Sequence, residues 1–216
     1  MCFSATASLS ASILLTGSGI GAIKKMESSK MLAFASVPIL FGLQQLSEGI
    51  LWLSYTHPNI APWQHASMYS FLLFAKVIWP VWIPFSIWLM EPDSGRKKIL
   101  SYLIILGGIG SVYLAYCLFA YDVSATIEER HIRYQMQIPQ LGLHRVLYLL
   151  GAAVPFFVSS LKYMKLLGGT LIASLVLSYI FYFKHLISVW CFFAALLSAM
   201  VVFIIIYNSS RNSSLT

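Results

Sequence analysis

Apolar runs long enough to cross a bilayer recur along the whole chain of 216 residues. A hydrocarbon core about 30 Å thick takes roughly 20 apolar residues in a helix. The runs are continuous and lack the alternation of barrel strands, so they predict helices. The approximate spans are 3–23, 32–55, 68–90, 99–121, 144–161, 168–183 and 186–207. The expected fold class is all-α: a polytopic membrane protein with a seven-transmembrane-helix bundle. It forms a single domain over 1–207, followed by a short polar cytoplasmic tail at 208–216.

The first run is rich in Ser, Gly and Thr and is followed by Lys24 and Lys25. A signal peptide has its positive charge before the apolar stretch instead. We therefore interpret this run as a retained helix whose small residues allow close packing against its neighbours.

Composition supports the membrane assignment. Hydrophobic residues make up 59% of the chain and charged residues only 10%, against about 25% charged in soluble proteins. This excludes a soluble enzyme and a disordered or fibrous protein. The net charge of +7 comes in short clusters and not in a stripe interleaved with aromatics. The expected partner is therefore the lipid bilayer and no nucleic acid, while the oligomeric state stays open.

The basic residues predict an orientation. Loops on one side of the predicted bundle, with the tail, contain nine of them: Lys24, Lys25, Lys30, Arg96, Lys97, Lys98, Lys162, Lys165 and Arg211. The other side has four: Arg130, Arg133, Arg145 and Lys184. Because cytoplasmic loops are enriched in Lys and Arg, the N-terminus is expected outside and the C-terminus in the cytoplasm.

Two ionisable residues, Glu48 and Lys76, fall within predicted spans. They lie at nearly the same depth on helices that are expected to be antiparallel, at a rise of about 1.5 Å per residue. Intramembrane charges are expensive and usually face a partner or a wet cavity. Glu48 and Lys76 could thus form an ion pair that only joins two helices. Alternatively, Glu48 lies in a polar cavity that opens outward.

Further polar residues surround Glu48 in the sequence. Gln44 and Glu48 are four residues apart and share a helix face, and Gln45 can extend the stripe towards Trp52. Gln side chains can also simply join membrane helices by hydrogen bonds. The candidate ligand-binding residues are Gln44, Gln45, Glu48, Trp52, Lys76 and Trp190.

All five histidines and all three cysteines fall toward the predicted outer side, although Lys-rich cytoplasmic loops leave little room for histidine elsewhere. Thiolate and imidazole ligands suit zinc and copper, which are the cofactors we consider. A membrane Cys is often only a small apolar residue. The metal or thiol candidates are Cys2, Glu48, His65, His131, His144, His185 and Cys191.

The third span contains Pro80 and Pro84, which predict a kink because proline removes a backbone donor. Glu91, Asp93 and Arg96 follow it in EPDSGRKK and are expected to form a solvated turn.

The opening MCFSATAS, the runs QQLSEGILWL and FAKVIWPVWIP, the following EP and the run VWCFFAALLS resemble a family of small, largely uncharacterised bacterial multi-pass membrane proteins that begin Met-Cys-Phe-Ser. The resemblance implies a bacterial inner membrane location and no particular reaction. Lys76 departs from the family pattern, which weakens the ion-pair interpretation. The matching positions are Cys2, Phe3, Ser4, Gln45, Glu48, Trp52, Pro80, Pro84, Glu91, Pro92, Trp190 and Cys191.

Three functions are compatible with the sequence. The leading one is binding or transport of a metal ion or small cation in an outward-facing polar cavity around Glu48. The second is a membrane-embedded enzyme, a metal-dependent hydrolase or a thiol redox protein, that acts on a lipid-like substrate. The third is a structural or accessory subunit whose polar groups only hold helices together.

Overall fold

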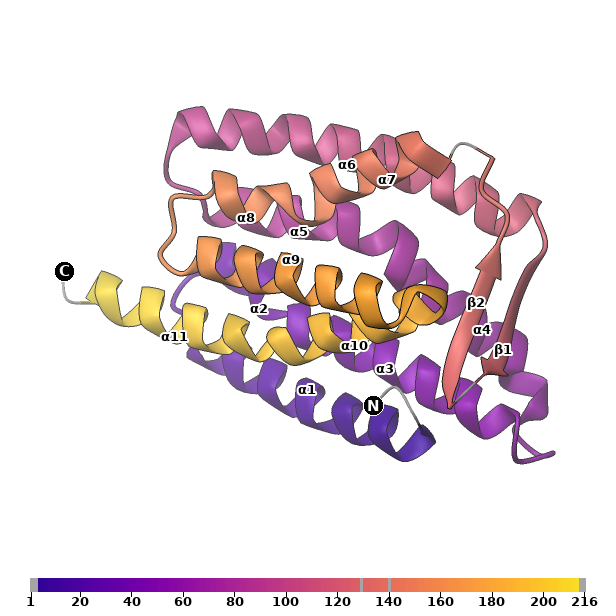
Figure 1. Ribbon diagram of the computed structural model, residues 1–216. Coiled ribbons are helices and arrows are strands. Elements are labelled where there is room, and N and C mark those ends of the chain that lie inside the picture. Colours follow the sequence, from indigo (N-terminus) through magenta and orange to yellow (C-terminus); the bar gives the residue numbers. More distant parts are fainter. Residues whose placement is uncertain (1–3, 129, 140, 214–216) are drawn as a thin grey trace.

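A computed structural model describes residues 4–128, 130–139 and 141–213. The chain is mostly helical, and its long helices run side by side between two ends (Figure 1). One end holds the start of α1 and a β-hairpin and is called here the hairpin end. The other holds the end of α11 and is called the tail end.

The first helices pack closely through small residues, as the sequence predicts. Helix α1 (Ala5–Lys25) lies against α3 (Val37–Ser54), which follows η1 (Ser29–Met31) and α2 (Leu32–Ala35). A Cβ added at Gly19 would meet Ile39 at 2.4 Å, and one at Gly42 would meet Thr16 at 2.5 Å. Glycine is therefore required where these two backbones approach each other.

The kink predicted in the third span is a π-helical turn. The helix runs from η2 (Ala61–Trp63) and α4 (Gln64–Leu72) through η3 (Leu73–Ile78) into α5 (Trp79–Met90). Pro80 has no N–H for the carbonyl of the preceding turn, and a widened turn accommodates it. Neighbouring helices use the freed carbonyls: Tyr148 donates to Ala75 O at 2.9 Å and Ser111 to Val77 O at 2.7 Å.

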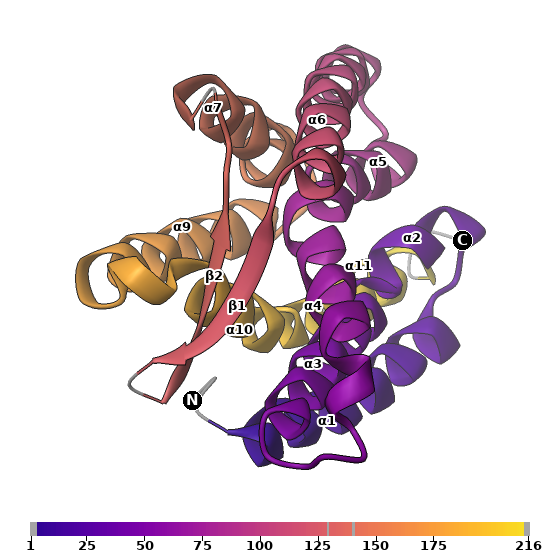
Figure 2. The ribbon, with the colours of Figure 1, turned by 90° about the vertical axis from the view of Figure 1, so that its right-hand side faces the viewer.

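The predicted fourth-to-fifth loop contains a β-hairpin, so the all-α prediction is wrong in this segment. It follows α6 (Ser94–Ala120) and pairs β1 (Val123–Glu128) with β2 (His131–Met136) in antiparallel register. The hairpin crosses one end of the bundle (Figure 2). Its Ile132 and Tyr134 are buried among side chains from α3, α4 and α6. Burial of alternate strand residues explains why this polar stretch is ordered.

The last part of the chain is α7 (Leu141–Ala152), α8 (Val154–Val158), α9 (Met164–Phe181), η4 (Phe183–His185), α10 (Leu186–Leu197) and α11 (Ala199–Ser213). The described backbone of α11 is helical to Ser213, so the expected tail begins as helix. The fifth predicted span, 144–161, is two short helices because the chain breaks before Pro155.

Five described helical segments are long and apolar enough to cross a membrane: Ala5–Lys25, Ala61–Met90, Ser94–Ala120, Met164–Phe181 and Phe183–Tyr207. The chain is therefore described as a multi-span membrane protein. Segments α2–α3 and α7–α8 correspond to the other two expected spans, and the count of seven stays a prediction. The start of α1 and the end of α11 lie toward opposite ends (Figure 1). Which end faces the cytoplasm also stays a prediction.

The expected solvated turn after α5 is wrong for Glu91, whose side chain is 3% exposed. Its carboxylate accepts hydrogen bonds from Ser159 Oγ at 3.0 Å and Ser160 N at 2.9 Å, and from Ser160 Oγ and Asp93 N. Arg96 nearby donates to Val158 O at 3.0 Å. The turn thus joins the α5–α6 connection to the α8–α9 connection.

Candidate functional site

Glu48 lies near the C-terminal end of α3 with its side chain fully buried. Ser188 of α10 donates to Glu48 Oε1 at 2.6 Å. The Tyr134 hydroxyl of β2 lies near the same carboxylate. Glu48 Oε2 has no hydrogen bond of normal geometry within the described residues. The two carboxylate oxygens are therefore not equally satisfied by the described chain.

The structure does not form the Glu48–Lys76 ion pair. In the described ranges, the ion pair found is Arg133–Glu128 on the hairpin, at 3.1 Å. Lys76 lies half-buried in the π-helical turn, close enough to the Cys191 thiol and Arg145 for electrostatic interaction. Across those same ranges, Glu48 thus has no side-chain cation within 4.0 Å.

A stripe of buried polar atoms continues from Glu48 along α3. Both amide atoms of Gln45, which is 0% exposed, and the Nε1 of Trp52 lack hydrogen-bond partners in the described part of the chain. Spacings of three and four residues put Gln45, Glu48 and Trp52 on one helix face, as the sequence predicts. An unpaired buried polar group costs about 1–3 kcal/mol. Water, an ion or a ligand usually explains such a group.

Gln44 has a different role from this stripe. Its Oε1 accepts a hydrogen bond from Trp79 Nε1 of α5 at 2.8 Å, and its amide lies beside the Cys191 thiol. The Trp79 ring stacks on Phe41 with 3.9 Å between centroids. Gln44 thus joins α3 to α5, which is the structural role considered for glutamine.

The histidine candidates separate into different places. His131 of β2 and His185 are buried with ring centroids 4.7 Å apart, and Tyr182 lies 5.2 Å from His131. His144 is buried at the start of α7, whereas His65 is exposed on α4. No group of three His, Cys, Asp or Glu side chains that could hold a metal ion occurs among the described residues. Cys2 lies outside the residues that the structure describes.

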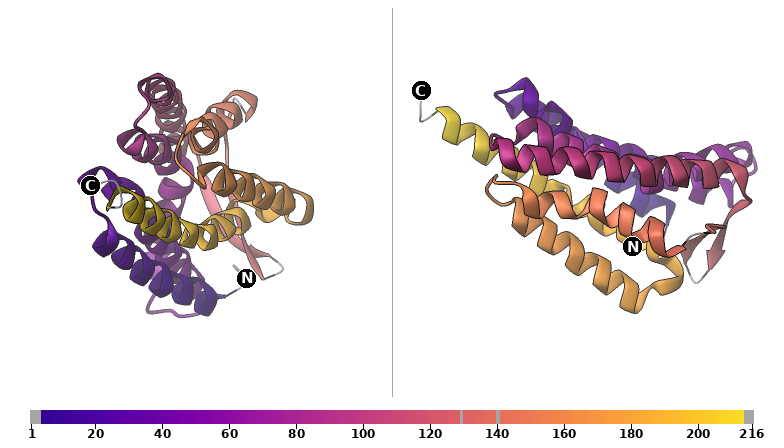
Figure 3. Two further views of the ribbon diagram at one scale, coloured as in Figure 1. Left: turned by 90° about the vertical axis from the view of Figure 1, so that its left-hand side faces the viewer. Right: turned by 90° about the horizontal axis from the view of Figure 1, so that it is seen from above.

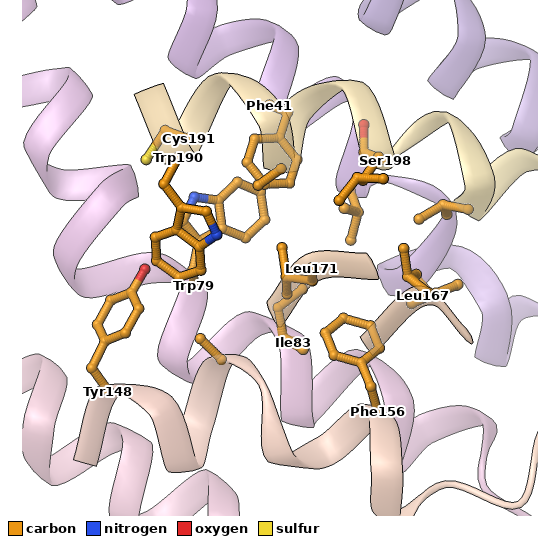
Figure 4. A pocket seen from close by; sticks show the side chains of 16 residues that line it. Phe41, Trp79, Ile83, Tyr148, Phe156, Leu167, Leu171, Trp190, Cys191 and Ser198 are labelled. Carbon is orange, nitrogen blue, oxygen red and sulfur yellow. The ribbon is translucent and has the colours of Figure 1, made fainter. Parts of the chain in front are cut away.

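Trp190 and Cys191 lie between this polar interior and an apolar pocket that both of them line, together with Tyr148 and Trp79 (Figure 4). The Trp190 ring is 6.0 Å from Tyr148. The sequence did not indicate Tyr134 or Tyr148, since one lies in the unpredicted hairpin and the other on a helix with no polar motif. Trp79 was interpreted only as an interfacial or packing residue.

Helices of membrane-spanning length around a buried carboxylate define a multi-span helical membrane protein with a polar interior. The chain belongs to a family of unknown function, DUF6629, whose model matches residues 1–215. No curated protein and no solved structure matches it. The family match confirms the resemblance to an uncharacterised family, whereas bacterial origin and the Met-Cys-Phe-Ser opening as a family feature stay predictions.

Proposed function

We propose that the protein binds a small cation that brings its own hydrogen-bond acceptors, at the stripe of Gln45, Glu48 and Trp52 on α3. The observation that supports this proposal is the fully buried Glu48 carboxylate, which has one unpaired oxygen and no cation within 4.0 Å in the described ranges. An ionised carboxylate is not stable in an apolar interior without a compensating charge. A bound cation would supply that charge and one donor.

The other unpaired atoms restrict the chemistry of the ligand. Glu48 Oε2 and Gln45 Oε1 need donors, whereas Gln45 Nε2 and Trp52 Nε1 are donors that need acceptors. A bare metal ion would contact only the two oxygens. A hydrated monovalent ion, or a short organic ammonium with a hydroxyl or carbonyl group, would satisfy all four atoms. The Trp52 ring would add a favourable face for an organic cation.

The setting of the site follows from the predicted topology. The site lies in the half of α3 nearer the hairpin end, which the charge distribution assigns to the outside of a bacterial inner membrane. The hairpin covers this end through Tyr134 and through the Tyr55 hydroxyl, which donates to Ala125 O. Ligand would therefore enter from outside past the hairpin into the single domain of residues 1–207. Binding is also the first step that transport would require.

Titration calorimetry on the purified full-length protein tests this proposal with sodium, potassium, ammonium and choline as probes. We expect one of these cations to bind to the wild type. Glu48→Gln should weaken its binding at least tenfold, since the variant lacks the negative charge. Glu27→Gln, at an exposed carboxylate on the tail end, should bind as the wild type does. Equal binding by Glu48→Gln and the wild type, or no binding of any probe, contradicts the proposal.

Elemental analysis tests the zinc or copper alternative in parallel. If metal copurifies with the wild type and is lost in Cys2→Ala, the protein has a metal centre that includes Cys2. The small-cation proposal would then be wrong. Absence of metal from both preparations leaves the cation proposal as the better account of Glu48. The Gln44–Trp79 hydrogen bond fits the accessory-subunit hypothesis, but it leaves the unpaired atoms of Gln45, Glu48 and Trp52 unexplained.

A further inference from the structure

A partly enclosed apolar pocket lies among the helices. Helices α3 and α5 form one wall, and α7–α8, α9 and α10–α11 form the others (Figure 4). No lining residue carries a charge. The lining includes Tyr148, Phe156, Leu167, Trp190, Cys191 and Ala194.

The pocket differs between its two ends. Tyr148, Trp190 and Cys191 lie at one end, and Phe156 and Leu167 lie toward the other (Figure 4). The indole N–H of Trp190 is buried without a partner in the described part of the chain. Because this group can only donate, the matching ligand atom is an acceptor. The Tyr148 hydroxyl already donates to Ala75 O, so its oxygen can also accept.

The helices around the pocket do not all approach one another equally closely. Helices α8 and α9 approach closely at Gly168, where an added Cβ would meet Phe156 Cβ at 2.7 Å. Helices α7 and α9 lack a comparable contact over their described residues, and α9 angles away from α7 (Figure 3). The outer face of α9 exposes apolar side chains such as Val176 and Ile180.

We propose that this pocket binds a single-chain lipid-like molecule with a neutral carbonyl head, such as a long-chain ester or ketone. The apolar chain lies along Phe156 and Leu167, and the carbonyl oxygen accepts from Trp190 Nε1. An ionic head group does not fit, because the lining contains no charge to pair with it. The site is separate from the one proposed at Gln45, Glu48 and Trp52, and either can fail without the other.

Photo-crosslinking of the full-length protein with a diazirine-bearing C16 methyl ester tests the site. Peptide mapping should place the label on the pocket lining, and an excess of unlabelled methyl palmitate should compete. Ala194→Phe fills the pocket and should reduce labelling at least tenfold. Ala173→Phe makes the same change on the exposed face of α9 and should label as the wild type does.

Trp190→Phe provides a second test that does not fill the pocket. It keeps a ring but removes the donor, and loss of one hydrogen bond of about 1 kcal/mol predicts a roughly fivefold weaker competition by methyl palmitate. If the label is confined to outward-facing side chains, the probe binds only at the outer surface of the protein and the proposal is overturned. Equal labelling of the wild type, Ala194→Phe and Trp190→Phe would overturn it as well. If Ala194→Phe does not fold, the Trp190→Phe result decides.

Discussion

Two carboxylates are buried among the residues that the structure describes, and their surroundings differ. Glu91, at the tail end, accepts hydrogen bonds at both oxygens from Ser159, Ser160 and Asp93. Glu48, in the other half of the bundle, accepts a hydrogen bond of 2.6 Å from Ser188, and within the described residues its second oxygen has no hydrogen bond of normal geometry. Burial alone therefore does not identify a functional group.

The two carboxylates differ in how many of their acceptor positions the chain itself fills. A carboxylate that joins two loops has its acceptors filled by the chain itself, so nothing else needs to bind there. Near Glu48 the chain leaves donors and acceptors of Gln45 and Trp52 unused as well. A polar group that is fully satisfied stabilises one structure, whereas partly satisfied groups imply a further occupant.

The same substitution at the two positions should have the largest difference in effect. Glu91→Gln places an amide NH2 against donors of Ser159 and Ser160. It should lower the free energy of unfolding by about 2–3 kcal/mol, the range for hydrogen bonds to charged groups. Glu48→Gln should lower it by less than about 1 kcal/mol, because Ser188 can donate to the amide oxygen. Thermal unfolding in detergent, without added ligand, measures both.

Glu27→Gln, an exposed carboxylate at the same end as Glu91, provides the control for removing a charge. Its effect should stay within about 0.5 kcal/mol, as is usual for surface substitutions. If Glu48→Gln lowers the free energy of unfolding more than Glu91→Gln does, Glu48 mainly stabilises the fold and the comparison fails.

Most of the helices could be predicted from the sequence because apolar length alone identifies them. The points at which the helices are interrupted could not be predicted. The π-helical turn before Pro80 and the break before Pro155 depend on which neighbours fill the freed positions: Gly107 and Gly151 both pack against the Pro80 carbonyl. The hairpin was missed because its buried residues, His131, Ile132 and Tyr134, lie in a polar stretch with no long apolar run.

The candidate site was predictable in part. Glu48 stood out because charge is rare within a span, and helical spacing put Gln45 and Trp52 on its face; all three are buried in the structure. The alternative of an ion pair with Lys76 is not formed, because equal depth does not specify which way a side chain points. The role of Glu91 could not be found, since its donors come from Ser159 and Ser160, far away in the sequence.

A smaller effect is expected when Glu48 loses its bond from Ser188. Ser188→Ala should lower the free energy of unfolding by about 1 kcal/mol, a typical value for hydrogen bonds between membrane helices. In a Glu48→Gln background the same change should cost less, because the lost acceptor is then neutral. A double-mutant cycle by thermal unfolding measures the coupling, with Ser174→Ala on α9 as the control. Equal costs in both backgrounds would show that Ser188 stabilises α10 independently of Glu48.

The smallest effect is expected for Ser159→Ala at the satisfied carboxylate. Glu91 would keep its bonds from the Ser160 backbone, the Ser160 hydroxyl and Asp93, so no acceptor oxygen becomes unpaired. We expect a loss of about 0.5 kcal/mol, the lower limit for a single hydrogen bond. Ser10→Ala, at an exposed position of α1, should change stability by less in the same unfolding assay. If Ser159→Ala lowers the free energy of unfolding more than Ser188→Ala does, the comparison fails. The number of donors that remain on a buried carboxylate would then not determine how much each single hydrogen bond contributes to stability.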